Sequence, residues 1–316
     1  MAASLKRSVP DVWLLVRSRP AVPLASTRVL ADALAAAYGS RFAVRHTDEL
    51  LIGVQDGRLI LRTPAGDDLP APKVICVRQV PGSTRHDHEV TLLRHLERMG
   101  STLINSQESH ATCRNKFWQL QELAVAGLPV PASLSYATTP LDRVVRTPGL
   151  DVPCVVKSVN GFGGTDVFLA PDLPTLRGTA DGAAHDVPLL FQQYVASSHG
   201  RDLRVVIVDG EPVAAAVRTS RDGALASNVT RGGSAGLCAG RYPEAEALAV
   251  LAARALGLTI AGVDLLFTAT GAHTICEVNA VPGWRPQMTA VVPAIIDCID
   301  RRLHDGPDDG SPDLSP

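Results

Sequence analysis

Residues 260–285 constrain this chain most strongly, because two apolar, strand-like runs there carry acidic and amide side chains at matching positions. Asp264 lies in the run AGVDLLF, and Glu277 and Asn279 lie in the run HTICEVN. A two-residue turn at Thr270-Gly271 would join the runs as a hairpin with Asp264 opposite Glu277. Asn279 then projects from the same face as Glu277, because strand side chains alternate between the two faces. The stretch therefore predicts a sheet that presents two carboxylates and an amide together.

Opposed carboxylates repel each other in a sheet, so this hairpin predicts a cation between them. Two carboxylates and an amide oxygen form the hard-oxygen set that suits Mg²⁺ or Mn²⁺ shared with substrate phosphates. The alternative is that both acids lie on an edge strand and face solvent. The pairing by itself leaves the choice between a metal site and a solvated edge open.

Charge and composition exclude several classes of protein. The 316 residues are 46% hydrophobic and 20% charged, which argues against disorder, and the net charge of -2 gives no broad attraction for nucleic acid or membrane. No apolar run approaches a membrane span, and WLLV near the N-terminus is too short for a signal-peptide core. The six cysteines form no C-x-x-C pair, which is typical of reduced cytosolic thiols and not of a cysteine metal site. We expect a cytoplasmic protein with small-molecule partners, no nucleic acid and no membrane.

Strand and helix patterns alternate over residues 11–108 and predict an open α/β domain. One helix is expected over residues 112–127, after which strand-like runs dominate and Asp209-Gly210 predicts a hairpin turn. Further helices are expected over 243–257 and 288–303, followed by a disordered acidic tail over 304–316.

Lys157 and the glycines after it are candidates for holding phosphate. Of 30 basic residues only four are lysines, yet Lys157 is kept inside the apolar run DVPCVVKSV and is followed by NGFGGTDV. Glycines let backbone amides approach a polyphosphate, and an ammonium offsets its charge. The run is not a Walker loop, and an ordinary hairpin turn is the alternative.

Further polar groups recur after residue 190. The end of FQQYV at 191–195 could meet an adenine ring with its backbone, although a core strand is the alternative. Asp202 and Arg204 share a strand face, and the loop SNVTRGGSA offers either anion-binding groups or an ordinary surface. An ideal turn at Asp209-Gly210 puts Arg204 and Arg218 on opposite faces, so we expect Arg204 in the site and not Arg218, unless a bulge shifts the register.

In their order along the chain, these motifs resemble the ATP-grasp superfamily and, within it, the RimK-type glutamate ligases, which join a carboxylate to an amine. The resemblance covers residues 78 to 300, and its motifs are Lys116, Lys157-x-x-x-Gly161-Phe-Gly-Gly164, Gln192-Gln-Tyr-Val195, Asp202-x-Arg204, Ser227-Asn228-x-x-Arg231-Gly-Gly233, Ala261-Gly-Val-Asp264 and Glu277-Val-Asn279-Ala-Val-Pro-Gly283. It implies an α/β N-terminal domain at 11–108, followed by an ATP-grasp fold of α+β type. Two subdomains, 109–190 and 191–303, would clamp the nucleotide.

The resemblance also implies roles for single residues. ATP would be bound by Lys116, Lys157, Gly161, Gly163, Gly164, Gln193, Tyr194, Val195 and Asp202. The γ-phosphate and a developing acyl phosphate would be surrounded by Arg204, Asn228 and Arg231. Mg²⁺, or Mn²⁺, would be held by Asp264, Glu277 and Asn279.

The chain departs from the family pattern at several positions. Gln193 stands where the family usually has an acid, and Asn115 replaces the acid common before Lys116. Ala226 stands where a base is usual, so glutamate is not assigned as a substrate. The substrate candidates are Arg78, Arg85 and Arg285.

The implied activity is ATP-dependent formation of an amide between a small carboxylic acid and a small amine, through an acyl phosphate, with release of ADP and phosphate. The alternatives are a kinase or cyclising ligase on the same fold, or a nucleotide-binding protein without turnover. The resemblance also raises a homo-oligomer as an option.

Overall fold

The computed structural model describes residues 10–17, 25–78, 86–146, 151–160, 167–182, 188–221, 223–225 and 233–305. Contacts between residues group the chain into two compact units, one of residues 1–108 with 283–316 and one of residues 109–282. The division into 11–108, 109–190 and 191–303 stays a prediction. The last helix, α8 (Val291–Asp305), groups with the N-terminal unit and continues two residues into the predicted tail.

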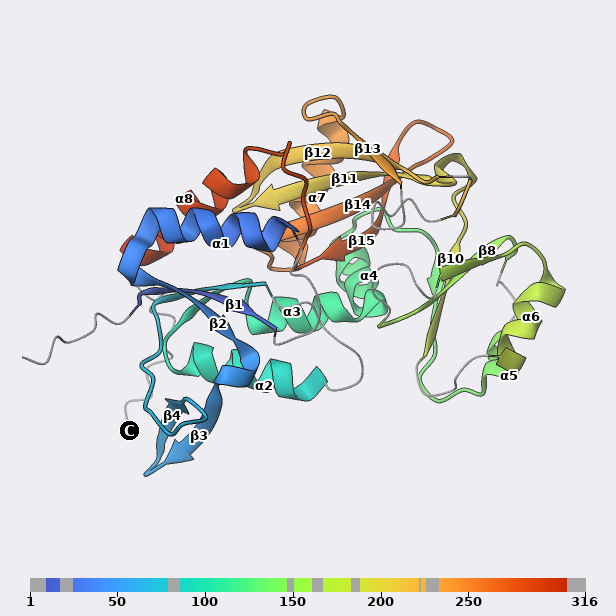
Figure 1. Cartoon of the computed structure of the whole chain (residues 1–316). Coiled ribbons are helices and arrows are strands. Elements are labelled where there is room, and N and C mark those ends of the chain that lie inside the picture. Colours follow the sequence, from blue (N-terminus) through green and yellow to red (C-terminus); the bar gives the residue numbers. More distant parts are fainter. Residues whose placement is uncertain are drawn as a thin grey trace, which may run out of the picture. The chain divides into compact units, whose positions relative to one another are not determined.

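The first unit is built on a parallel four-stranded sheet in the order β2-β1-β5-β6, as the alternation of strand and helix patterns predicts. Its strands are β1 (Val12–Val16), β2 (Phe42–His46), β5 (Val74–Val77) and β6 (Thr102–Ile104). Helices α1 (Ala25–Tyr38) and α8 lie on one face and α2 (His86–Arg98) on the other (Figure 1). Because β1 lies between β2 and β5, the chain reverses its direction of sheet growth at β1, which is where open α/β sheets bind ligands.

Short elements complete this unit. Strands β3 (Leu51–Gln55) and β4 (Arg58–Arg62) form an antiparallel hairpin. The 3₁₀ turns η1 (Gly39–Arg41) and η2 (Thr47–Glu49) flank β2. The hydroxyl of Tyr38 donates to the Asp300 carboxylate at 2.9 Å and so ties the end of α1 to α8.

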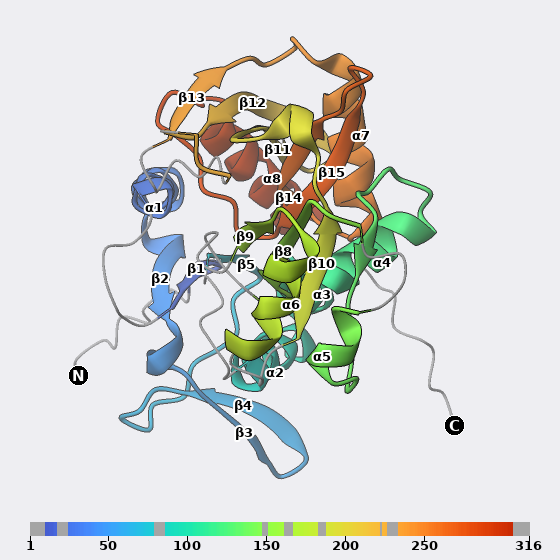
Figure 2. The same cartoon turned by 90° about the vertical axis from the view of Figure 1, so that its right-hand side faces the viewer.

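The second unit contains a small antiparallel sheet in the order β7-β10-β8-β9. Its strands are β7 (Ser133–Leu134), β8 (Cys154–Ser158), β9 (Val167–Ala170) and β10 (Leu189–Gln193). Helices α5 (Leu141–Val144) and α6 (Leu173–Gly182) pack on one face, where they share a core with Val156 and Phe191 (Figure 2). The opposite face carries Lys157, Leu190 and Gln192, because strand side chains alternate.

The single helix expected over residues 112–127 is wrong: the structure has two, α3 (Gln107–Arg114) and α4 (Lys116–Val125). Asn115 separates them, because its backbone is extended and its side-chain oxygen accepts bonds from Phe117 N at 2.9 Å and Trp118 N at 3.2 Å. This is the geometry of an N-cap, for which asparagine is a preferred residue.

A five-stranded antiparallel sheet in the order β13-β12-β11-β14-β15 dominates the second unit (Figure 1). The strands are β11 (Arg201–Val208), β12 (Glu211–Thr219), β13 (Ser234–Leu237), β14 (Ile260–Phe267) and β15 (His273–Asn279), and the 3₁₀ turn η3 (Ala196–Ser198) precedes β11. Helix α7 (Pro243–Ala255) buries its alanine-rich face against Leu203, Val205 and Val263. The side chains that alternate with these residues lie on the other face of the sheet.

The β14–β15 hairpin pairs Asp264 with Glu277 as predicted, although the turn differs from the predicted one. Thr268 N bonds to Ala272 O, and Gly271 takes φ +85°, so the turn has three residues with glycine in the left-handed region. The longer turn moves the register by one residue, and a bulge at Cys276 moves it back. Two offsets that the sequence pattern did not reveal cancel each other.

The β11–β12 hairpin corrects the preference for Arg204 over Arg218. Asp209 and Gly210 both have positive φ, which confirms the two-residue turn. A bulge then shifts the register beyond Val206, so that Arg218 pairs with Asp202 and projects from the same face as Arg204. Both arginines belong to the polar face.

Candidate active site on the five-stranded sheet

One face of the five-stranded sheet carries a row of charged and amide side chains. Their positions follow from strand alternation together with the two bulges, since their neighbours in each strand point toward α7. The row consists of Asp202, Arg204, Arg218, Asp264, Glu277 and Asn279. Part of a sheet face that could have been wholly apolar is thus given to ionic and amide groups.

Asp264 lies at the centre of the row and is almost fully buried. Arg204, opposite it on β11, binds both its oxygens in a bidentate pair, with Nη2 at 2.7 Å from Oδ2. Arg218 Nη2 lies 2.9 Å from Oδ1 of the same carboxylate. Burial alone would raise the pKa of Asp264, but the two guanidiniums outweigh burial and hold that pKa below its usual value. Asp264 is therefore ionised at neutral pH.

Arg218 joins two carboxylates. It binds Asp202 in a second bidentate pair, with Nε at 2.6 Å from Oδ1, in addition to its contact with Asp264. Burial lowers the pKa of a guanidinium, but the two acids raise the pKa of Arg218 above its usual value. Asp202, Arg218, Asp264 and Arg204 thus form one continuous chain of alternating charge.

Gly262 makes room for Arg204. A Cβ at Gly262 would lie 2.9 Å from Nη1 of Arg204 and 2.7 Å from the Cβ of Pro282. A glycine inside a buried strand is a sequence signal for such a close approach. Asn279 lies opposite Gly262, and its amide nitrogen is 3.4 Å from Oδ2 of Asp264.

Lys116, the first residue of α4, joins that helix to the row through Glu277. Its Nζ donates to Oε1 of Glu277 at 2.9 Å, and its backbone N–H donates to the carbonyl of Val159 at 2.8 Å. Gln119, one turn further along α4, accepts a bond from the N–H of Val278 at 2.9 Å. The helix and β15 are therefore held together at Glu277 and at the next residue, Val278.

Lys157 is buried on the small sheet and donates to Oε1 of Gln192 at 3.0 Å. Gln192 in turn donates to the hydroxyl of Ser133 at 3.1 Å. The bulge residue Cys276 approaches Gln192 Oε1 to 4.0 Å. This contact links the small sheet to β15, and burial raises the pKa of the Cys276 thiol, which keeps it protonated and inert at neutral pH.

The residues expected at an adenine ring lie at the end of β10 and just beyond it. Gln193 bonds to Ala132 through its backbone N–H at 2.8 Å, and the Tyr194 hydroxyl is 2.7 Å from Nδ1 of His199. Val195 leads into η3. Five residues predicted to bind ATP or to surround the γ-phosphate lie outside the described residues: Gly161, Gly163, Gly164, Asn228 and Arg231.

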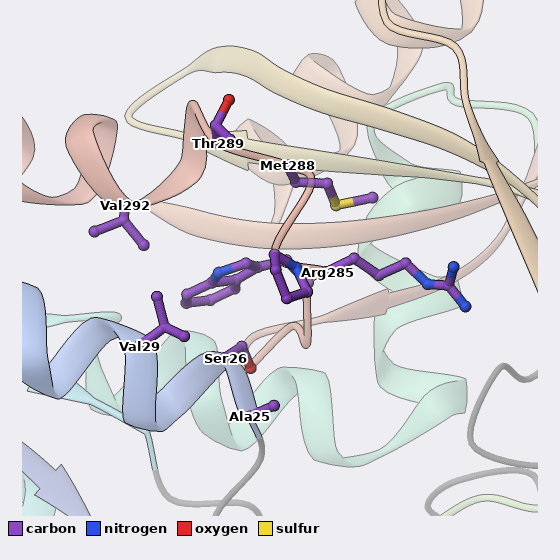
Figure 3. Close-up of a pocket in the computed structure, with 9 residues that line it drawn as sticks. Ala25, Ser26, Val29, Arg285, Met288, Thr289 and Val292 are labelled. Atoms are coloured by element: carbon purple, nitrogen blue, oxygen red, sulfur yellow. The ribbon is translucent and has the colours of Figure 1, made fainter.

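The substrate candidates Arg78 and Arg285 belong to the first unit. Arg78 is buried directly after β5, while Arg285 follows Trp284 beside a cavity at the start of α1 (Figure 3). Arg85 lies outside the described residues.

Arg218 is the one charged residue of the row that the sequence analysis rejected. Gln192 and Gly262 were quoted in motifs but were given no role. Pro212, beside the bulge in β12, was the available signal for Arg218, because prolines inside strands are found at bulges.

The row fits a divalent cation that is shared with a ligand. Among the described residues no three His, Cys, Asp or Glu side chains gather as a metal group, so the protein oxygens do not form a self-sufficient cage. Two carboxylates and one amide do lie on one face, and Mg²⁺ is commonly held by one or two carboxylates together with substrate phosphates. The basic side chains that now compensate these acids are also suited to phosphate oxygens.

Comparisons with known proteins agree with this chemistry. Residues 113–299 match the family described as RimK-like ATP-grasp domain. The chain belongs to the RimK-like ATP-grasp family. It is 38% identical over 239 residues to N-acetylaspartylglutamate synthase A of Mus musculus, which covers 75% of this chain and 63% of that protein. It is 32% identical over 217 residues to a probable alpha-L-glutamate ligase of Legionella pneumophila (strain Corby), covering 68% of this chain and 70% of that one.

Solved structures show the same ATP-grasp fold. D-cycloserine synthetase superposes with a TM-score of 0.68 at 20% identity, covering 92% of this chain and 99% of that chain. An ATP-grasp ligase solved with a precursor variant, Mg and ADP gives a TM-score of 0.66 at 20% identity, covering 93% of this chain and 99% of that chain.

The chain spans only part of the length of the curated relatives that it matches. It covers 63% of N-acetylaspartylglutamate synthase A of Mus musculus and 62% of β-citrylglutamate synthase B of Homo sapiens. Within the described residues, none of the helices has the length and apolar character needed to cross a membrane.

Replacing Gly262 with alanine tests the close approach of Arg204. We expect Gly262→Ala to lower the free energy of unfolding by about 1–3 kcal/mol, because the new methyl group overlaps Arg204 and Pro282. Gly178→Ala is the matched control, since a Cβ there meets nothing within 4 Å and alanine favours a helix. Equal unfolding midpoints for the two variants in urea would contradict the role of Gly262.

A double-mutant cycle tests the pairing of Asp202 with Arg218. Arg218→Gln should destabilise the protein by about 3 kcal/mol, because it leaves buried carboxylates uncompensated. With Asp202→Asn, the coupling energy from urea unfolding should lie at ~1–3 kcal/mol. The exposed pair of Arg62 and Asp68 is the control and should couple by less than ~1 kcal/mol. Similar coupling in both pairs would show that Arg218 does not lie where the shifted register places it.

Proposed function

We propose that the chain is an ATP-dependent ligase that joins a small carboxylic acid to a small amine and releases ADP and phosphate. The observation that carries the proposal is the polar row, in which Asp264 faces Glu277 on one side and Arg204 on the other. Two acids for a cation and two arginines for a transferring phosphoryl group are the parts that phosphoryl transfer needs. The carboxylate would pass through an acyl phosphate, which the amine then attacks.

The basic residues of the site would have two tasks. Some would bind the phosphates of the nucleotide, and others would stabilise charge on the phosphoryl group that is transferred. Lys157 and Lys116 would contact the nucleotide phosphates, and Asp202 the nucleotide. The backbone from Gln193 to Val195 would border the adenine, and the glycines at 161, 163 and 164 would cover the triphosphate. Arg204, Asn228 and Arg231 would surround the γ-phosphate, and Arg218, bonded to Asp202 and Asp264, would position both acids.

Asp264, Glu277 and Asn279 would hold Mg²⁺ or Mn²⁺. When bound with ATP, the cation would neutralise phosphate charge during transfer. Lys116 and Arg204, which pair with these acids in the structure, would then be free to turn toward phosphate oxygens. The row is preorganised for this exchange because each acid already has a basic neighbour.

An amino acid is the amine that we propose first. The names of the relatives N-acetylaspartylglutamate synthase A and alpha-L-glutamate ligase share glutamate, so glutamate belongs at the head of a substrate panel. The enzyme would act on small molecules in the cytoplasm. We also propose that it assembles into a homo-oligomer.

A substrate panel tests the proposal. Purified protein with ATP and Mg²⁺ should release phosphate only when an acid and an amine from the panel are both present, with glutamate as the first amine. Hydroxylamine added in place of the amine should trap a hydroxamate, because the acyl phosphate is electrophilic. ADP formed with the carboxylic acid alone, without incorporation of an amine, would indicate a kinase. Nucleotide binding without release of ADP or phosphate for any pair would indicate a binding protein.

Glu277→Gln tests the polar row directly. The amide keeps the shape of the side chain and removes its charge, so we expect kcat to fall about 100-fold or more while the thermal unfolding midpoint changes little. Glu211→Gln, on the exposed start of β12, is the control and should keep wild-type turnover. EDTA should abolish turnover in all three proteins. Full activity of Glu277→Gln would reject the assignment of this row.

A further inference from the structure

The hairpin of β3 and β4 carries apolar side chains beyond the core of the first unit, from which it projects (Figure 1). Leu61 and Ile52, near its base, pack on that core. Val54, on the same face as Ile52, is 73% exposed, and Leu51 on the other face is 52% exposed. Single exposed apolar side chains need no explanation, so the backbone of β3 decides whether these two do.

The backbone of β3 has an open outer edge. Residues 56 and 57 both take positive φ, so the two-residue turn closes on a hydrogen-bonded pair, Gln55 with Arg58. Because bonded and non-bonded pairs alternate along an antiparallel ladder, the N–H and C=O groups of Ile52 and Val54 point away from β4. Among the described residues, no third strand joins this sheet and no hydrogen bond reaches these groups.

Strand β3 also lacks the features that keep edge strands from pairing, which are charged side chains, proline, a bulge or a covering segment. Of the described strands longer than four residues, the others at a sheet edge all carry charge: Arg45 in β2, Arg58 and Arg62 in β4, and Glu277 in β15. The sequence of β3, LIGVQ, has neither charge nor proline, and its register with β4 is regular. Such an edge is a template for another strand.

The opposite edge of the hairpin is partly covered. The N–H of Leu69 donates to the carbonyl of Leu61 at 2.8 Å, and Arg62 forms a bridge with Asp68. The guanidinium of Arg62 also binds the Asp68 carboxylate at 2.7 Å and Oε1 of Gln55 at 3.0 Å. A further strand therefore has better access to β3 than to β4.

We propose that β3 pairs antiparallel with β3 of a second copy of this chain, about a two-fold axis at Gly53. Ile52 of one copy then lies opposite Val54 of the other, and the two residues exchange backbone hydrogen bonds. The two hairpins become one continuous sheet, on which Ile52 and Val54 of both copies form an apolar strip. At the axis, glycine faces glycine, and an interior glycine suits the close approach of another backbone.

A second copy fits this strand because the strand is complementary to itself. Pairing about Gly53 sets residues 51–55 against the same uncharged residues, so no charge is buried. The exposed acids Asp48 and Glu49 before β3 come beside the turn of the other copy, where Arg58 balances the single acid at residue 56. Parallel pairing would instead bring the acids of both copies together, so rim charge favours the antiparallel two-fold.

The size of the contact predicts a reversible dimer. One pair of strands and the side chains on it lie at the low end of specific interfaces, below ~1,200 Å², where association is weak. The inference rests on the homo-oligomer proposed above, for which it names the surface, and not on the ligase chemistry.

Sedimentation equilibrium of the full chain tests the pairing. Between ~1 and ~200 μM, the average mass of the wild type should rise from monomer toward dimer. Val54→Lys places an ammonium on the open edge and should raise the Kd of the dimer about 10-fold or more. Val44→Lys makes the same change at an exposed valine of β2 and should keep the Kd within about 2-fold of wild type.

Val54→Pro tests the backbone itself. It removes an N–H that points away from β4, so the ladder within the hairpin should persist while the Kd of the dimer rises about 10-fold or more. If Val54→Pro fails to fold, Val54→Lys still decides, because its side chain is exposed.

Cysteine substitution tests the position of the axis. The Cα atoms of a non-hydrogen-bonded pair lie ~4.5 Å apart, within the span of a disulfide, so Gly53→Cys should give a covalent dimer on mild oxidation. Leu51→Cys is the control, because it faces Gln55 of the other copy and lies about 13 Å along the strand from its own counterpart. A non-reducing gel compares both variants with the wild type, which reports any linkage through the native cysteines.

Three results would overturn the inference. A wild type that stays monomeric at ~200 μM leaves the edge to solvent or to a strand of another protein. Equal Kd values for Val54→Lys and Val44→Lys would place the dimer contact elsewhere, and equal covalent yields from Gly53→Cys and Leu51→Cys would reject the two-fold at Gly53. The substrate panel decides the ligase function separately: a monomer that releases phosphate rejects only the pairing, and a dimer without turnover rejects only the ligase.

Discussion

The second unit depends on a buried chain of alternating charge, in which Asp202, Arg218, Asp264 and Arg204 lie side by side on a sheet face. Moving one such charge out of water costs several kcal/mol unless a well-aligned partner compensates it. Arginine supplies that alignment, because its planar fork binds both oxygens of a carboxylate. The two lysines of the site are point charges: Lys116 donates to Oε1 of Glu277, and Lys157 donates to Oε1 of Gln192. The bidentate arginine pairs therefore set the geometry of the buried acids in this structure.

That charged face exists only because the backbone departs twice from regular pairing. In β15, both Ile275 and Val278 belong to the core under α7, which strict alternation forbids. The bulge at Cys276 allows it and turns Glu277 outward. Without that extra residue, the acid would lie in an apolar core at high cost, because a one-residue slip moves side chains to the other face. The bulge therefore matters to the site as much as its acids do.

The sequence was sufficient for features that local chemistry determines. Asp209-Gly210 predicts its turn because both positions take positive φ, and apolar runs predict the strands. The pairing of Asp264 with Glu277 was predicted from a turn that does not form, and it holds because the longer turn and the bulge offset each other. Bulges depend on tertiary packing, so only Pro212 gave a local sign of one, and the bulge at Cys276 gave none. Asn115 likewise reads as a helix interior residue until its capping bonds are seen.

The family match includes the polar row but only part of the cavity at the start of α1. The whole polar row lies within residues 113–299, whereas Ser26, Val29 and Arg78 lie outside that match. The cavity is lined from both parts, since Trp284 and Arg285 follow the strand that carries Glu277 and Asn279 after a short connection. A change at Val29 alters the shape of the cavity and leaves every charge of the row in place. The N-terminal residues of the cavity can therefore vary while the costly buried ionic network stays unchanged.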